Sequence, residues 1–148
     1  MTQVDTQRDP GRETARRIWF EWHRRAKACD VDGLLELYAQ DALFESPLVP
    51  RLLDTASGVL RGHEELRPFL RKGADARPNQ LVRWYRPEEF FWDGRTLVWE
   101  YPRESPDGDQ LGLVEIMDIV DGLIQRHRIY WGWVGTEMLI DNAIAKVR

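Results

Sequence analysis

The sequence predicts one α+β domain: a cone-shaped roll in which a curved antiparallel sheet wraps around N-terminal helices and encloses a pocket. Three observations predict it. Apolar residues recur at three- and four-residue steps in the first half of the chain, which is typical of helices. From Gln80 onward, short strand-like segments alternate with turn sequences. Helices that precede a run of strands favour an α+β fold over alternating α/β units.

The length and the cysteine content support one self-sufficient domain. We place it at residues 13–148, after a polar tail at residues 1–12, because 148 residues correspond to one domain. A chain this long buries about 70% of its unfolded surface and needs no stabilising disulfide or metal. The single Cys29 excludes an intramolecular disulfide and a multi-cysteine zinc site, and it is compatible with the cytoplasm, where we place the protein.

Charge and hydropathy argue against two classes of partner. The net charge is −4 and acidic and basic residues are interleaved, so we expect no nucleic-acid partner. The polar start lacks the apolar core of a signal peptide, and no apolar run approaches the roughly 20 residues that cross a bilayer. Seven tryptophans exceed the needs of a small core and suggest a pocket wall or an oligomer interface.

Four helices are expected. The first, residues 13–29, carries apolar side chains at helical spacing: Ala15, Trp19, Trp22, Ala26 and Cys29. Asp30 and Asp32 are suited to cap a second helix that runs to Tyr38. A third helix, residues 63–72, contains Pro68, which should bend it or shift its start. Thr136 is expected to cap a last helix that ends at Lys146.

The strands are expected between turn sequences. A short strand at residues 42–47 ends at Pro47, and an irregular loop follows at residues 48–61. The later strands are residues 81–86, 90–92, 96–104, 111–119 and 123–134. The turns between them contain Asp93-Gly94, Pro106-Asp107-Gly108 and Asp121-Gly122.

Which side chains of the last two strands point to the concave face depends on the turn between these strands. Read as a three-residue loop with a glycine bulge, Val120-Asp121-Gly122 pairs Ile119 with Leu123 and sets Glu115 opposite His127. A two-residue Asp-Gly turn would shift the register by one and break that pairing. The first interpretation gives a mostly apolar concave face, which consists of Leu113, Glu115, Met117, Ile119, His127, Ile129, Trp131 and Trp133.

The preceding turn leaves a similar choice. A Pro-Asp-Gly turn with a bulge directs Trp99, Tyr101 and Arg103 inward, and a two-residue turn directs Glu100 inward instead. We favour the first, because two rings suit an apolar wall better. The opposite face of the sheet is mixed and partly apolar, which suits the surface of a homodimer.

Three stretches resemble a known family. Residues 29–47, the Gly62-His-Glu-Glu-Leu-Arg stretch and the segment from Glu115 to Trp133 resemble SnoaL-like proteins of the nuclear transport factor 2-like superfamily, over about residues 13–140. The resemblance implies a cone of helices on a curved sheet that is commonly dimeric. Members include ketosteroid isomerases, polyketide cyclases, scytalone dehydratase, limonene epoxide hydrolase and plain binding proteins.

The resemblance transfers few catalytic residues. The general-base Asp of ketosteroid isomerase falls on Ser46, its oxyanion-hole Tyr on Trp22, and its protonated oxyanion-hole Asp on Glu115, which keeps a carboxyl group. The residues of limonene epoxide hydrolase do not align, since its second Asp falls near Ile129. Scytalone dehydratase uses two His and one Asp, and of these only one His has a counterpart in this chain, His127.

Glu115 and His127 are the main catalytic candidates. A carboxyl group in an apolar cone loses hydration and becomes able to act as an acid or base near neutrality. A histidine hydrogen-bonded to this carboxyl group would be held in a fixed orientation, and the pair could accept a proton from an acidic carbon or from a water. The alternative is that Glu115 is a structural carboxylate and His127 a satisfied core residue. Two such groups are too few to predict a metal site.

Other residues are expected to bind substrate. Tyr101 and Arg103 are candidates to stabilise a developing oxyanion, as is Tyr38 from the helix side. Ser46, at the mouth, is expected to hydrogen-bond a ligand, and His23 and His63 to be solvated on their helices. The predicted substrate-binding residues are Trp22, Tyr38, Phe44, Ser46, Trp99, Leu113, Met117, Ile129 and Trp131.

Two functions remain open at the level of sequence. The first is a cofactor-independent isomerase, cyclase, dehydratase or hydratase that acts on a small hydrophobic molecule by acid/base chemistry. The second is a binding protein of the same fold that turns nothing over. The fold does not choose between them, because function is determined by the site.

Overall fold

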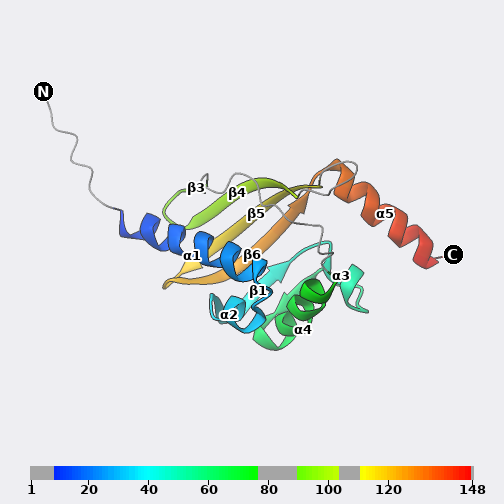
Figure 1. Cartoon of the computed structure of the whole chain (residues 1–148), viewed down its shortest axis with the longest axis horizontal. Coiled ribbons are helices and arrows are strands. Elements are labelled where there is room, and N and C mark those ends of the chain that lie inside the picture. The colour runs from blue at the N-terminus through cyan, green and yellow to red at the C-terminus, as the bar shows by residue number, and fades with distance from the viewer. Residues whose placement is uncertain (1–8, 77–89, 104–110, 148) are drawn as a thin grey trace, which may run out of the picture.

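The computed structural model describes residues 9–76, 90–103 and 111–147 (Figure 1). The predicted α+β class and curved sheet are confirmed, with six strands in the order β2-β1-β6-β5-β4-β3. The elements are α1 (Pro10–Lys27), α2 (Val31–Leu35), β1 (Tyr38–Glu45), α3 (Val49–Leu52), β2 (Val59–Arg61), α4 (Gly62–Asp75), β3 (Phe91–Trp92), β4 (Thr96–Arg103), β5 (Leu111–Val120), β6 (Leu123–Trp131) and α5 (Trp133–Val147).

The helices are distributed unevenly over the sheet. Figure 1 shows α1 lying across one face of the sheet, α2, α3 and α4 on the β1 side, and α5 running out beyond the end of β6. Neighbouring strands run antiparallel except β1 and β6, which pair in parallel. Within the described parts of the chain, no helix is long and apolar enough to cross a membrane.

Helix α1 begins earlier than predicted. Asp9 caps it by accepting from the amide of Gly11, and Pro10 takes the first helical position, where its missing N–H costs nothing. The predicted apolar stripe is buried from Ala15 to Ala26, with Trp19 and Trp22 facing the sheet. The helix ends at Lys27, so Cys29 lies beyond it with a positive φ of 56°.

Two short elements were missed in the segment after α1. Asp30 caps α2 as predicted, but Tyr38 opens β1 instead of closing the helix. The stretch predicted as an irregular loop, residues 48–61, holds α3 and β2. Helix α4 passes through Pro68 and continues to Asp75, longer than predicted.

The turn between β5 and β6 differs from the favoured interpretation. Asp121 and Gly122 form a two-residue turn, both with positive φ, and Val120 pairs with Leu123. The predicted pairing of Glu115 with His127 is therefore wrong. A bulge at Gln125 then shifts the register by one more residue, so Met117 lies opposite His127 and Glu115 opposite Ile129. Two single shifts add to an even number, so the strand residues beyond the bulge return to their predicted faces, whereas before it Ile124 takes the place predicted for Leu123 opposite Ile119.

Strand β4 keeps the predicted inward position of Trp99. Trp99 pairs with Glu115 and is 1% exposed, whereas Glu100 is exposed. The backbones of Tyr101 and Arg103 pair with those of Leu113 and Leu111. The predicted turn at residues 105–109 and the predicted strand at residues 81–86 lie outside the described residues.

The end of β6 corrects the last prediction for the concave face. The strand stops at Trp131, and α5 begins at Trp133 rather than after Thr136. Thr136 instead lies in the first turn, where its amide donates to the carbonyl of Gly132. Trp133 is 73% exposed and takes no part in the concave face.

The opposite face of the sheet carries exposed Tyr130 and the ion pair between Asp118 and Arg128. It is mixed in character, as the strand alternation predicts. A homodimer through this face remains a prediction.

Candidate functional site

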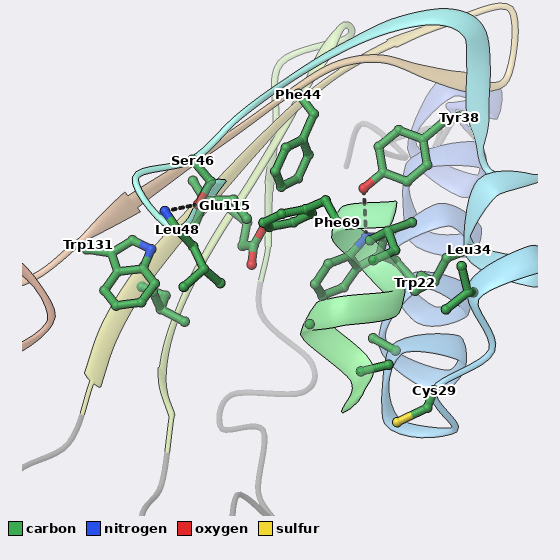
Figure 2. A pocket seen from close by; sticks show the side chains of 17 residues that line it. Trp22, Cys29, Leu34, Tyr38, Phe44, Ser46, Leu48, Phe69, Glu115 and Trp131 are labelled. Carbon is green, nitrogen blue, oxygen red and sulfur yellow. Dashed lines mark hydrogen bonds between the residues drawn. The ribbon is translucent and has the colours of Figure 1, made fainter. Parts of the chain in front are cut away.

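A cavity of about 110 Å³ lies between the concave face of the sheet and helices α1, α2 and α4. Figure 2 shows its wall from close by, with Cys29 at one end and Ser46 and Trp131 at the other. Cys29 is exposed, whereas Ser46 is 1% exposed. The cavity therefore runs from an outer end beside the loop after α1 to an inner end between β1, β5 and β6.

Most of the predicted binding residues line this cavity. They are Trp22, Tyr38, Phe44, Ser46, Leu113, Ile129 and Trp131, and they are joined by Glu115. Trp99 and Met117 do not line it, because they lie farther along the concave face, where α1 covers the sheet and leaves them 1% and 0% exposed. The prediction that Ser46 lies at the mouth is also wrong, because it lies at the inner end.

The sequence analysis missed the helical part of the wall. The missed residues are Ala26, Cys29, Val31, Leu34, Leu48, Phe69, Leu70, Gly73 and Ala74. Several were visible as apolar positions at helical spacing, including Phe69, Leu70 and Gly73 on α4. Periodicity identifies such a face as buried, but it does not separate a wall that touches the sheet from one that stands away from it.

Glu115 and His127 meet despite the changed register. They are diagonal neighbours on the concave face, and Nε2 of His127 is hydrogen-bonded to Oε2 of Glu115. Both side chains are almost fully buried, at 1% and 0% exposure. Glu115 lines the cavity and His127 does not, so the histidine lies behind the carboxylate.

Two further side chains extend this contact into a chain of hydrogen bonds. The indole Nε1 of Trp22 donates to the hydroxyl of Tyr38 at 3.1 Å, and that hydroxyl lies 2.7 Å from Nδ1 of His127. Figure 2 shows the bond between Trp22 and Tyr38 on the helix side of the cavity. The four residues come from α1, β1, β6 and β5, so the hydrogen bonds link one helix to three strands of the sheet.

The chemistry of the groups fixes the direction of the first bond and leaves two arrangements for the others. An indole N–H only donates, so the Tyr38 oxygen accepts from Trp22. With a bare Nδ1 on His127, the Tyr38 hydroxyl donates to that nitrogen and Nε2 donates to Glu115; with a protonated Nδ1, that nitrogen donates to the second lone pair of the Tyr38 oxygen. In the first arrangement Glu115 is the acceptor at the end of the chain.

Burial keeps the Tyr38 hydroxyl protonated and the His127 ring out of contact with water. Burial raises the pKa of Tyr38 far above its ordinary value, with the charge of Glu115 acting in the same direction, so the phenol keeps its proton. Phe44 meets the His127 ring edge-on at 5.1 Å, and Trp22 does so at 5.7 Å. These rings exclude water from the imidazole.

The remaining candidates have different outcomes. The side chains of Tyr101 and Arg103 lie outside the described residues, so their catalytic roles remain predictions. His23 and His63, which were predicted to be solvated, are half-buried. The His23 ring packs 5.3 Å from that of Trp99, and Nε2 of His63 lies 2.9 Å from the carbonyl oxygen of Tyr38. Among the described residues, no group of three or more His, Cys, Asp or Glu is placed to hold a metal ion.

Comparisons with known proteins identify the fold. No protein-family model matches the sequence, and no curated protein matches it. A SnoaL-like protein of unknown function from Burkholderia thailandensis superposes with a TM-score of 0.66 at 20% identity, over 82% of this chain and 96% of that chain. A nuclear transport factor 2-like protein from Anabaena variabilis also gives 0.66, at 16% identity over 90% and 95% of the two chains.

A third similar structure carries a functional name. It is a candidate ketosteroid isomerase from Kribbella flavida, with a TM-score of 0.60 at 18% identity over 82% of this chain and 79% of that chain. These matches show that this chain has the fold of the nuclear transport factor 2-like superfamily. At such identities they show the fold alone, and the chemistry rests on the site.

Proposed function

We propose that the protein is a cofactor-independent enzyme that moves a proton on a small hydrophobic substrate, with Glu115 as the general base. One observation carries this proposal: the carboxyl group of Glu115 lines an apolar cavity and is hydrogen-bonded to Nε2 of a buried histidine. A base at that position is oriented before substrate arrives, and water is scarce around it.

The proposed reaction needs no redox partner. Glu115 removes a proton from a substrate carbon, the electron pair moves toward an adjacent electron-withdrawing group, and the protonated carboxyl returns the proton at another atom. Isomerisation is the simplest outcome, and cyclisation or dehydration can use the same first step, whereas in a hydration Glu115 would remove a proton from the attacking water. His127 touches no substrate atom in this arrangement, so it is a positioning residue that stabilises the carboxylate through Nε2.

Proton exchange in D₂O tests the base directly without knowledge of the natural substrate. Small cyclic ketones with acidic C–H groups serve as probes, and proton NMR follows the loss of their α-proton signals. We expect wild-type protein to accelerate the exchange and Glu115→Gln to lose about 100-fold or more of that acceleration, the usual contribution of a positioned base. Glu100→Gln, the same change at an exposed site of the neighbouring strand, is the matched control.

Exchange at the wild-type rate in Glu115→Gln would contradict the assignment of the base. The second candidate function, a binding protein without turnover, is favoured by the fact that His127 is held on both ring nitrogens and sealed from the cavity. It predicts that the ketones bind wild-type protein without accelerated exchange.

A further inference from the structure

The inner end of the cavity contains a hydrogen-bond donor that the protein does not use. Nε1 of Trp131 is buried and has no hydrogen-bond partner. Trp19, Trp92 and Trp99 also carry buried indole N–H groups without a partner, but none of those three lines the cavity. A buried donor that lacks an acceptor costs free energy, and an acceptor atom of a ligand in the cavity would recover it.

The position of this indole is set by the first turn of α5. A Cβ built on Gly135 would lie 2.4 Å from Cε3 of Trp131, so the ring rests directly against the helix backbone. Any larger residue at position 135 must push the ring away. The backbone of Trp131 is fixed as well, because it pairs with Leu113 on β5. The unused N–H is therefore held in place before a ligand arrives.

Ser46 supplies a second donor close by. Its side chain is 1% exposed, and its Oγ accepts from the amide of Leu48 at 3.1 Å. With the oxygen acting as acceptor, the hydroxyl proton is left to donate to an atom in the cavity. Figure 2 shows Ser46, Trp131 and the carboxylate of Glu115 gathered at the same end of the cavity.

These groups define complementary halves of one site. Glu115 pairs with Ile129 and Trp131 with Leu113, so the two residues are diagonal neighbours on the same face, a spacing that places the backbones of such residues about 7–8 Å apart. The carboxylate repels an anionic ligand and suits a C–H that it can deprotonate. The two donors suit a neutral oxygen acceptor that gains negative charge as that proton leaves.

We propose that Trp131 Nε1 and the Ser46 hydroxyl form an oxygen-binding subsite, and that the substrate class is a small cyclic carbonyl compound whose oxygen binds there while its α-carbon faces Glu115. This inference rests on the proposed function for the role of Glu115. At about 110 Å³ the cavity is smaller than an engineered cavity of about 150 Å³ that accepts benzene, so we expect a ligand of no more than one small ring. The donors then take the role of an oxyanion hole.

The test compares two ligands of the same shape. Cyclohexanone and methylenecyclohexane differ only in the exchange of the carbonyl oxygen for a CH₂ group. Proton–nitrogen NMR of the tryptophan indoles follows binding, and the Trp131 signal is assigned by its absence in Trp131→Phe. We expect the Trp131 N–H signal to move downfield with the ketone, and the ketone to bind about tenfold more tightly than the alkene, as for one recovered hydrogen bond.

Three variants separate the subsite from general packing. Trp131→Phe keeps a ring but loses the donor, so its preference for the ketone should fall to about twofold or less. Gly135→Ala keeps the indole N–H but displaces it, and should lose part of the preference. Trp133→Phe removes an indole that is 73% exposed, and should leave the preference unchanged. Thermal unfolding of each variant shows that it is folded.

The outcomes distinguish the subsite from the proposed function. Equal affinity of wild-type protein for the two ligands, or a Trp131 signal that the ketone leaves unmoved, overturns the subsite. Ketone binding at Trp131 without accelerated α-proton exchange supports the subsite and removes the proposed catalysis. Accelerated exchange that survives in Trp131→Phe with unchanged affinity supports the base and removes the subsite.

Discussion

The two ends of the concave face share their strands but not their packing. At the end nearest the turn of Asp121 and Gly122, Trp99 and Met117 are fully buried and closely packed beneath α1. At the other end, Leu113 and Trp131 face the cavity. Both ends alternate apolar residues on β5 and β6 in the same way, so the sheet alone does not decide which end is hollow.

The helices decide it through the size of the side chains that they direct at the sheet. Over the packed end, α1 presents Trp19 and His23, whose rings pack against each other and, through His23, against Trp99. Trp22 contacts Trp99 as well but also lines the cavity, so it stands between the two ends. Over the hollow end, the helical wall includes Ala26, Gly73 and Ala74, which fill little volume. The comparison teaches that a pocket in this fold is made by small residues on the helices as much as by curvature of the sheet.

The largest effect on the free energy of unfolding is expected when one tryptophan at each end is replaced by alanine. Trp99→Ala removes a fully buried ring from the packed end, and we expect it to cost about 3–5 kcal/mol of unfolding free energy. Trp131→Ala removes a partly exposed ring that already borders a void, and we expect a cost of about 1–2 kcal/mol. Urea denaturation with a common m-value measures both.

Equal costs at the two positions would break the comparison. That result would mean that the hollow end is packed as tightly as the other in solution. A cost below about 2 kcal/mol for Trp99→Ala would instead mean that the packed end collapses around the missing ring.

A smaller effect is expected where the two ends meet, at Tyr38. Tyr38→Phe keeps the ring but removes the hydroxyl that bonds Nε1 of Trp22 and Nδ1 of buried His127. We expect a loss of about 1–3 kcal/mol of stability, because two buried polar atoms each lose a hydrogen bond. Nε2 of His127 keeps its bond to Glu115, so we expect the proton to stay on Nε2 while Nδ1 loses its bond to Tyr38.

Nitrogen-15 NMR of the imidazole rings measures this tautomer, and three histidines make assignment simple. In wild-type protein, His127 should show a bare Nδ1 and a protonated Nε2, and Tyr38→Phe should keep this tautomer while the Nδ1 signal moves toward that of a nitrogen without a hydrogen bond. A wild-type spectrum with Nδ1 protonated and Nε2 bare would reverse the direction of the hydrogen-bond chain and remove the role of Glu115 as the acceptor.

The sequence predicted the side of the sheet for nearly every residue of the site, but not the register. Alternation fixes which side chains share a face, and that property survives any even shift. The pairing itself depends on Asp121-Gly122 and on the bulge at Gln125. Nothing in the residues around position 125 signals a bulge, so the diagonal contact of Glu115 with His127 was inferred from the wrong register.

The helical wall and the roles of the polar groups were harder to predict. Phe69 and Gly73 lie on a periodic face, but their distance from the sheet depends on how α4 packs. The donor role of Trp131 was also out of reach, because it depends on an indole nitrogen without a partner and on contact with Gly135. Such properties arise from tertiary packing and leave no local pattern.

The smallest effect concerns His23, which fills the packed end beside Trp99. Burial lowers the pKa of His23, and this outweighs its bond to the Trp19 carbonyl and the charge of Glu115, which both act to raise it; Lys27 acts in the same direction as burial. Because the pKa is lower in the folded state, the unfolded chain binds more protons as the pH falls below about 6.5. Wild-type stability should therefore fall as the pH is lowered through that range.

His23→Gln and His23→Phe, which do not titrate, should both show a shallower fall when urea denaturation is repeated between about pH 7 and pH 5. An unchanged slope in both variants would mean that His23 is as hydrated in the folded protein as in the unfolded chain, and that the packed end is open to water.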